Sequence, residues 1–371
     1  MRARRLCRLI LRCWMSLVII LGLSSHSYNK RLRHSRFLQI YSWLMMTIGL
    51  GLYIPFWGHA RAYFAKGTFR RQGFVLQMSE GSVIFQLLPL IIHLVVRLKY
   101  ERQVCQIYNE LSDILDQDLG QKKQSRFYYI VFFGKVHNYL HNFNFVLGIL
   151  MIVDKRTVGI ADVLANIYFV YSSVVRESAL FAYFLLLLDF SEALRLNSEQ
   201  KQDSYGKLMA QLRRQERLLF LERQVHRIFA WLVASSLLFQ MFYNLGNIYL
   251  GYAFIIQRQD DVGLRLSNLK IILSTISLVV KLSDCLLLQI VCEHLLGQEK
   301  RQCGSPQVCD QDAKATERQW ELSILRRAIR EASKDKKVLG LFRMDMRCAF
   351  ALLSSSLSYG IIIIQMGYVH V

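Results

Sequence analysis

The chain has 371 residues, of which 53% are hydrophobic and only 3 are proline, and its formal net charge is +20. Apolar windows of about 20 residues, the length that crosses a bilayer, recur along it, which argues against a soluble protein and predicts a polytopic membrane protein. In a soluble protein this charge would suggest a nucleic-acid partner, but in a membrane protein it more often marks basic cytoplasmic loops, so we expect no nucleic acid to bind.

Residues 1–36 are expected to form a cytoplasmic N-terminal segment. The first twelve residues are rich in arginine, and an apolar stretch follows at 13–23. That order could be a secretory signal peptide. However, Arg8 and Arg12 stand among apolar neighbours, a pattern that better suits an amphipathic helix in the membrane interface. A second basic cluster, at 30–36, stands directly before the first full span.

Seven later stretches are apolar and long enough to cross the bilayer as helices, so the predicted fold class is an all-α integral membrane protein. They are 37–57, 74–96, 127–153, 162–190, 228–256, 264–292 and 339–368. The last four exceed the necessary length and should project beyond the bilayer. The third carries Lys135 and several His and Asn residues, so it should face protein or a wet cavity rather than lipid.

The chain therefore divides into four parts. After the segment 1–36, residues 37–292 hold six spans with basic cytoplasmic loops and the expected ligand pocket. Residues 293–338 form a cytoplasmic loop and a helix, and 339–371 form the last helix. Within 317–337, apolar residues recur at three-to-four spacing and predict a helix face packed on a neighbouring helix; they are Trp320, Ile324, Leu325, Ala328 and Ile329.

The distribution of Lys and Arg predicts the orientation. These residues are several times more numerous before the first span and after the second, fourth and sixth spans than in the other connections. Basic loops stay in the cytoplasm, so we expect the N-terminus inside and the C-terminus outside the cell.

This orientation disfavours a G-protein-coupled receptor, whose N-terminus lies outside. The chain also contains no Asn-Pro pair, and Tyr100-Glu101-Arg102 follows the second span, where we interpret it as a solvated helix end. A secondary transporter would more often show an internal repeat, and none is visible. No phosphate-binding glycine loop or nucleophile motif is present, so we expect no enzyme.

Ionisable residues inside the spans are candidates for function, because charge at membrane depth is costly. Arg176 and Glu177 lie in the fourth span. Lys281 and Asp284, in the sixth, are three residues apart and close enough to pair. A structural ion pair between helices is one interpretation. The other places Arg176 or Glu177 at the floor of a ligand cavity.

Aromatic residues crowd the fourth and fifth spans, as a cavity for a small organic ligand requires, although helix packing explains most of them. Tyr249 and Tyr252, near the expected outer end, are the predicted pocket residues among these. We expect neither metal nor cofactor. His137 and His141 lack a further ligand, and the single pair Cys303 and Cys309 makes a poor zinc site.

The last span carries an ordered motif. It begins with Gly340-Leu341-Phe342-Arg343-Met344-Asp345, continues to Ser358 and Tyr359, and after five small or aliphatic residues ends with Gln365 and Met366. This resembles the C-terminal signature of insect gustatory receptors: Gly-x-Phe-x-x-Asp, then Thr-Tyr, five apolar residues and Gln-Phe. Ser358 replaces the Thr and Met366 the Phe. The alternative is an ordinary last transmembrane helix with a chance glutamine.

The resemblance implies a subunit of a tetrameric, ligand-gated, non-selective cation channel in the plasma membrane of sensory neurons, opened by a small organic tastant. Its partners would be membrane lipid and identical or related receptor subunits. In that family the last helix lines the pore, which would place Gln365 near the gate with Ile361, Ile364 and Met366 around it. Tyr359 and Asp345 would be helix-packing residues of the motif.

Overall fold

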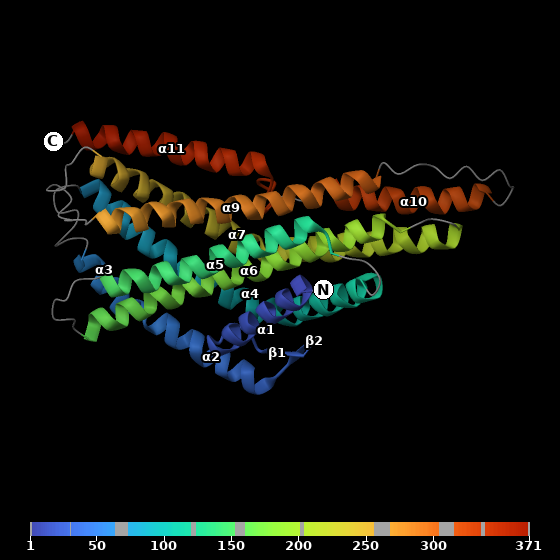
Figure 1. Cartoon of the computed structure of the whole chain (residues 1–371), viewed down its shortest axis with the longest axis horizontal. Helices are drawn as coiled ribbons and strands as arrows, with labels where there is room; N and C mark the ends of the chain where they lie inside the picture. Colours follow the sequence, from blue (N-terminus) through green and yellow to red (C-terminus); the bar gives the residue numbers. More distant parts are fainter. Residues whose placement is uncertain are drawn as a thin grey trace.

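The computed structural model describes residues 2–29, 31–63, 73–119, 124–152, 160–200, 204–255, 268–303, 315–334 and 338–369. Its elements are α1 (Arg2–Ile20), β1 (His26–Asn29), β2 (Arg31–His34), α2 (Arg36–Gly51), α3 (Tyr53–Tyr63), α4 (Gly73–Leu119), α5 (Arg126–Ile152), α6 (Ile160–Ser198), α7 (Tyr205–Ile255), α9 (Asn268–Cys303), α10 (Ala315–Lys334) and α11 (Met346–Val369). The long helices α5, α6, α7 and α9 run side by side (Figure 1). The predicted all-helical class is confirmed apart from one hairpin.

Helix α6 lies at the centre of the bundle because it is hydrophobic around its whole circumference. Phe181, Tyr183, Phe184 and Phe190 are each at most 1% exposed. These rings pack against α4, α5, α7 and α9, and α1 covers them from one side through Trp14, whose ring meets that of Phe181 edge-on at 5.0 Å. Most of the aromatic residues noted in the fourth span therefore form the core.

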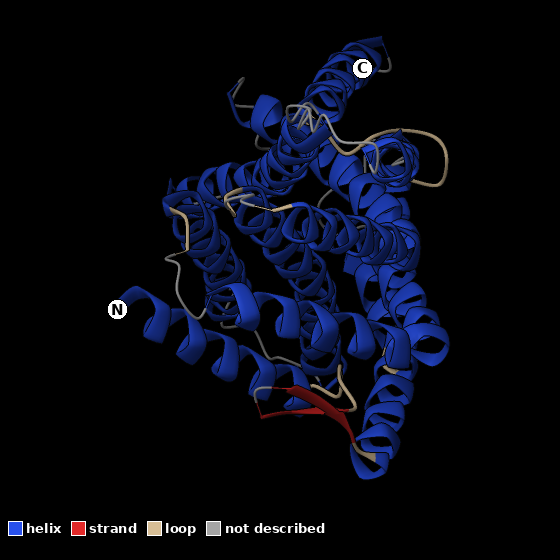
Figure 2. Cartoon of the chain, turned by 90° about the vertical axis from the view of Figure 1, so that its right-hand side faces the viewer, coloured by secondary structure: helices blue, strands red, loops and turns tan. Residues whose placement is uncertain are grey.

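The N-terminal segment contains the expected helix and also an antiparallel hairpin that the sequence did not predict. Strands β1 and β2 lie at the edge of the bundle opposite α11 (Figure 2). The hairpin is held by α4: the Leu32 N–H donates to Asn109 Oδ1 at 2.9 Å, and Asn109 Nδ2 donates to the Leu32 carbonyl at 3.0 Å. Arg31 and Asp113 add an exposed ion pair of 2.6 Å. Both strands are only four residues long, so tertiary contacts with α4 such as these specify them.

The first predicted span is divided into α2 and α3 at Leu52. Pro55 lies in the first turn of α3. Because proline has no N–H, it cannot donate the bond to the Gly51 carbonyl that would continue α2 without a break.

The helix of the second span continues far past the predicted end of that span at residue 96, as α4 runs to Leu119. Its apolar face goes on through Val104, Ile107 and Leu111, which pack in the main core. The interpretation of Tyr100-Glu101-Arg102 as a solvated helix end is therefore wrong. Glu101 lies in mid-helix, its side chain is 14% exposed, and it binds Arg97 at 3.0 Å.

Among the described residues, three helical stretches are long and apolar enough to cross a membrane: Arg36–His59, Tyr205–Leu245 and Met346–Gln365. The other four expected spans fall on α4, α5, α6 and α9, all of which carry buried ionisable residues. Helices α4, α6, α7 and α9 all extend beyond the predicted spans. Two extensions, those of α7 and α9, pack with α10.

The predicted amphipathic helix at 317–337 is present as α10, and its packed face agrees with the expected one at Leu325 and Ile329 but differs at Trp320 and Ile324. Ile329 is buried, and Leu322 and Leu325 pack beside it against the core. Trp320 and Ile324 are instead 67% and 47% exposed. Which face of α10 is buried depends on how the partner helices α7 and α9 are placed. The periodicity of the α10 sequence alone does not show this placement.

Candidate functional site

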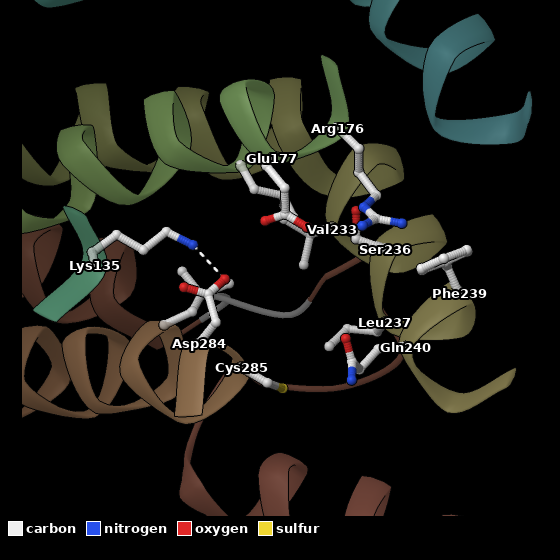
Figure 3. Close-up of a pocket in the computed structure, with 12 residues that line it drawn as sticks. Lys135, Arg176, Glu177, Val233, Ser236, Leu237, Phe239, Gln240, Asp284 and Cys285 are labelled. Carbon is white, nitrogen blue, oxygen red and sulfur yellow. Dashed lines mark hydrogen bonds and ion pairs between the residues drawn. The ribbon is translucent and has the colours of Figure 1, made fainter. Parts of the chain in front are cut away.

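A cavity of about 50 Å³ lies between α5, α6, α7 and α9, where these four helices meet in the middle of the bundle (Figure 3). Its polar lining includes Lys135 from α5, Arg176 and Glu177 from α6, Gln240 from α7 and Asp284 from α9. Four long helices thus each contribute a polar residue to one buried space. Charged groups placed this deep are costly and usually face a partner or a cavity.

Lys135 and Asp284 form the first ion pair of this cavity, with 2.5 Å between Nζ and Oδ2 and side chains only 4% and 13% exposed. Asn138 supports the carboxylate weakly through Nδ2, which lies 3.5 Å from Oδ1. The predicted pairing of Asp284 with Lys281 is not the one observed. A partner on the facing helix α5 holds Asp284, and the Lys281 side chain lies outside the described residues.

Arg176 and Glu177 form the second pair, 2.8 Å apart. Adjacent helical residues point in different directions, so this contact requires both side chains to turn into the cavity. The Arg176 guanidinium lies 4.0 Å from the centroid of the Phe239 ring of α7, a cation–π contact. The structure therefore brings both predicted α6 residues to the cavity wall.

The arrangement can recognise a compact polar molecule. Two cations and two anions leave the cavity formally neutral, and the Ser236 hydroxyl, also on its wall, is buried without a partner among the described residues. An engineered cavity of about 150 Å³ admits benzene. The observed space is about a third of that, so a larger ligand requires side chains such as Gln240 to move.

Sequence reasoning missed Lys135, Ser236, Phe239 and Gln240 as members of this cavity. One signal was available for Lys135. It is the only charged residue within the predicted span 127–153, and Asp284 on another helix has the complementary sign. Nothing in the sequence distinguishes the other three from core residues.

Helix α11 presents a second feature, an uncovered stripe. Ser354, Ser358, Ile361, Ile362 and Gln365 are all exposed, and their three-to-four spacing places them along one side of the helix. Tyr359, beside the stripe, is 53% exposed rather than packed within the chain. An apolar helix with one uncovered side requires lipid or a further subunit there.

The opposite side of α11 packs on α7. At Gly360 a Cβ atom would lie 2.8 Å from Ile248, so only glycine allows the two helices this approach. Ile363 is buried against Leu245, and Ile364 packs beside them. Of the four predicted gate residues, Ile361 and Gln365 thus share the exposed stripe, whereas Ile364 faces α7. The side chains of Met366, Tyr249 and Tyr252 lie outside the described residues.

The Gly-x-Phe-x-x-Asp segment forms a turn and a helix cap instead of the helix expected from residue 339. Leu339 and Gly340 have φ angles of 53° and 74°, and the Val338 N–H donates to the Phe342 carbonyl at 2.8 Å. Phe342 packs against the core. The Asp345 carboxylate accepts the Cys348 N–H at 3.0 Å, which makes Asp345 the N-cap of α11. The motif residues thus define where α11 begins.

No group of three or more His, Cys, Asp or Glu residues within the described part of the chain is placed to hold a metal ion. The His137 and His141 rings stack at 6.2 Å as neighbouring side chains of α5. Cys309 lies outside the described residues.

A family model described as "7tm Chemosensory receptor" matches residues 11–370. The Drosophila melanogaster protein named "Putative gustatory receptor 10b" is 53% identical over 372 residues, which covers 100% of both chains. The structure of the insect olfactory receptor OR5 from Machilis hrabei matches 96% of this chain and 99% of its own with a TM-score of 0.62 at 13% identity. Its complex with eugenol matches with a TM-score of 0.59.

Proposed function

Because this chain belongs to the 7tm chemosensory receptor family, among the gustatory receptors of insects, we propose that it is a subunit of a tastant-gated cation channel. The family consists of multi-pass membrane receptors rather than enzymes. The proposed channel is a non-selective tetramer of identical or related subunits in the plasma membrane of sensory neurons, with the N-terminus of each subunit in the cytoplasm.

The uncovered stripe of α11 is the observation that carries this proposal. A pore formed by several subunits needs one helix from each that is held by its own bundle on one side and free on the other. Helix α11 meets this requirement, with Gly360 and Ile363 packed on α7 and Ile361 and Gln365 exposed. A ring of isoleucine side chains can close a pore by dewetting, and a neighbouring glutamine ring offers ions a polar site.

The tastant is proposed to bind near the charged cavity between α5, α6, α7 and α9, where Arg176 and Glu177 lie. Two observations support a small organic ligand: the mixed polar and aromatic wall, and the fold shared with a receptor whose structure contains eugenol. Exchange of the Arg176–Glu177 contact for contacts with the ligand would alter the packing of α6 on α7.

Topology is tested first. An epitope tag placed after Val371 should be stained on intact cells, whereas a tag placed before Met1 should require permeabilisation. A C-terminal tag that is stained only after permeabilisation would contradict the proposed orientation and remove the basis for the pore assignment.

The pore assignment is tested by cysteine accessibility during tastant-evoked currents, in a Cys348→Ser background. A charged methanethiosulfonate reagent should reduce the current of Gln365→Cys and Ile361→Cys by most of its amplitude, because both side chains would line the conducting path. Ile363→Cys is the matched control, since its side chain is buried against α7. Equal modification of all three variants, or of none, would contradict the assignment.

A further inference from the structure

A second cavity, of about 160 Å³, lies between α1, the β1–β2 hairpin, α4, α6 and α7. It shares no residue with the charged cavity described above. Helix α1 and the hairpin form one side, and the cytoplasmic half of α4 in the proposed topology forms the other. The N-terminal segment thus forms one wall of a partly open space in addition to covering the bundle.

The walls of this cavity are mostly apolar. Trp14 and Val18 contribute from α1, Val96 from α4, Leu186 from α6 and Phe229 from α7. The volume is close to the roughly 150 Å³ of an engineered cavity that admits benzene. A single ring or a short chain therefore fits the space and meets mostly apolar side chains.

His93 of α4 supplies the polar feature. The residue is 9% exposed, and neither ring nitrogen has a hydrogen-bond partner within the described part of the chain. A neutral imidazole offers one donor and one acceptor, and leaving such groups buried without partners costs about 1–3 kcal/mol each. A hydroxyl group can satisfy either nitrogen, because it both donates and accepts.

The charges around the cavity exclude an ionic ligand. Arg97 is occupied by the Gly22 carbonyl at 2.7 Å and by Glu101 at 3.0 Å, so the two opposite charges already neutralise each other. Its Nε has no partner among the described residues and remains a donor for a neutral oxygen. A further charge without a counterion would be costly at this depth.

We propose that this cavity binds a neutral, monohydroxylated small molecule, a phenol or a short alcohol, with the hydroxyl at His93 and the apolar body against Trp14 and Phe229. The inference rests on this cavity alone and not on channel activity. It assigns to the N-terminal segment a ligand site separate from the proposed tastant site.

The test uses Trp14 as the reporter. In the full-length protein, purified in nanodiscs, the other four tryptophans are replaced by phenylalanine, and 4-bromophenol is titrated at pH 7, where it is neutral. Bromine quenches indole fluorescence only on contact. A matched protein keeps Trp43 alone, because that side chain is 49% exposed on the outer face of α2. We expect saturable quenching of Trp14 and a linear, non-saturable response of Trp43.

Two variants of the Trp14 protein decide whether the quencher occupies the cavity. Ala182→Phe fills the space from α6 and should abolish saturable quenching. His93→Phe keeps a ring of similar size but removes both hydrogen-bonding nitrogens, so the dissociation constant should rise about three- to tenfold, the value of one hydrogen bond. Where Ala182→Phe is not monodisperse on gel filtration, His93→Phe alone decides.

Three results would overturn the proposal: non-saturable quenching of Trp14, an unchanged dissociation constant in His93→Phe, or saturable quenching that survives in folded Ala182→Phe. A final experiment tests whether a lipid chain occupies the cavity. Nanodiscs made with acyl-brominated phosphatidylcholine should quench Trp43 strongly and Trp14 weakly. Equal quenching of both would identify a lipid chain in the cavity and would also overturn the proposal.

Discussion

The ion pair between Lys135 and Asp284 joins two helices that are far apart in the sequence. Its removal should therefore destabilise the folded protein. Asp284→Asn leaves the Lys135 ammonium buried without a counterion, so the unfolding free energy should fall by about 3–5 kcal/mol. Thermal unfolding of the purified protein, followed by intrinsic fluorescence, measures the effect.

The double variant Lys135→Met/Asp284→Leu is the control for this pair. It removes both charges and should recover most of the lost stability, because a buried ion pair replaced by apolar residues of similar volume is often neutral. A double variant as unstable as Asp284→Asn would show that the charges themselves are required.

The N-cap of α11 provides a smaller and more local test. Asp345→Ala removes the acceptor for the Cys348 N–H and should lower stability by about 1 kcal/mol, whereas Asp345→Asn should retain most of it. The melting temperatures of the two variants are compared directly. An equal loss of stability in both variants would mean that the charge of the Asp345 carboxylate stabilises the protein, and not its hydrogen bond as the N-cap.

At the level of single residues, the sequence predicted some neighbours and missed others for identifiable reasons. Arg176 and Glu177 were recognisable because charge within an apolar run is rare. The partner Lys135 of Asp284 was missed because helical spacing shows which residues could pair within a helix, whereas Lys135 stands on α5; the Lys281 side chain lies outside the described residues. Glu101 was misplaced because its burial depends on the hairpin and on Arg97.

At the level of elements, the hairpin and α4 are joined by a contact that should respond to acid. The Ser25 N–H donates to Glu101 at 2.9 Å, and His26 lies 3.5 Å from the same carboxylate. Burial opposes ionisation of Glu101, but Arg97 and the Ser25 hydrogen bonds outweigh it and lower its pKa. Burial also lowers the pKa of His26, partly opposed by Glu101, while His34 and Arg97 lower it further.

The pKa shifts of His26 and Glu101 both predict that the protein becomes less stable as the pH falls. A depressed histidine pKa makes the folded state disfavour His26 protonation, so stability should begin to fall as pH drops through about 6.5. The Glu101 contribution is present above its unfolded pKa of about 4.5 and is lost as pH falls further. Unfolding of the wild type and Glu101→Gln, measured from pH 7 to pH 4, should show a difference in unfolding free energy that persists from pH 7 to about pH 5 and narrows below about pH 4.5. A constant difference would contradict the assignment of charge to Glu101.

The existence of the helices was predictable, whereas several boundaries and the hairpin were not. Each of the seven apolar runs lies wholly or largely on a helix, because a bilayer span leaves a strong compositional signal. The break at Leu52 and the turn at Leu339 and Gly340 leave only weak local signals, a proline and a glycine. Strands β1 and β2 depend on Asn109, which is 77 residues from Leu32.

At the level of the whole molecule, the proposed tetramer predicts that the Gln365 side chains of different subunits lie close together. If α11 of each subunit surrounds a common axis, Gln365→Cys in a Cys348→Ser background should form disulfide-linked dimers on mild oxidation, as seen on non-reducing gels. Ile363→Cys should not, because α7 of its own subunit covers it. Cross-linking of Ile363→Cys in place of Gln365→Cys would place the subunit contact on the other side of α11.

The turn at 338–342 has a mechanical consequence. Leu339 is held in the left-handed region, at a cost of about 1–2 kcal/mol, and Gly340 follows it with the same handedness. Since no continuous helix connects α10 to α11, a twist applied to α10 is not passed on as rotation of one rigid rod. Helix α11 can instead swivel about its own axis through changes in the backbone angles of these two residues.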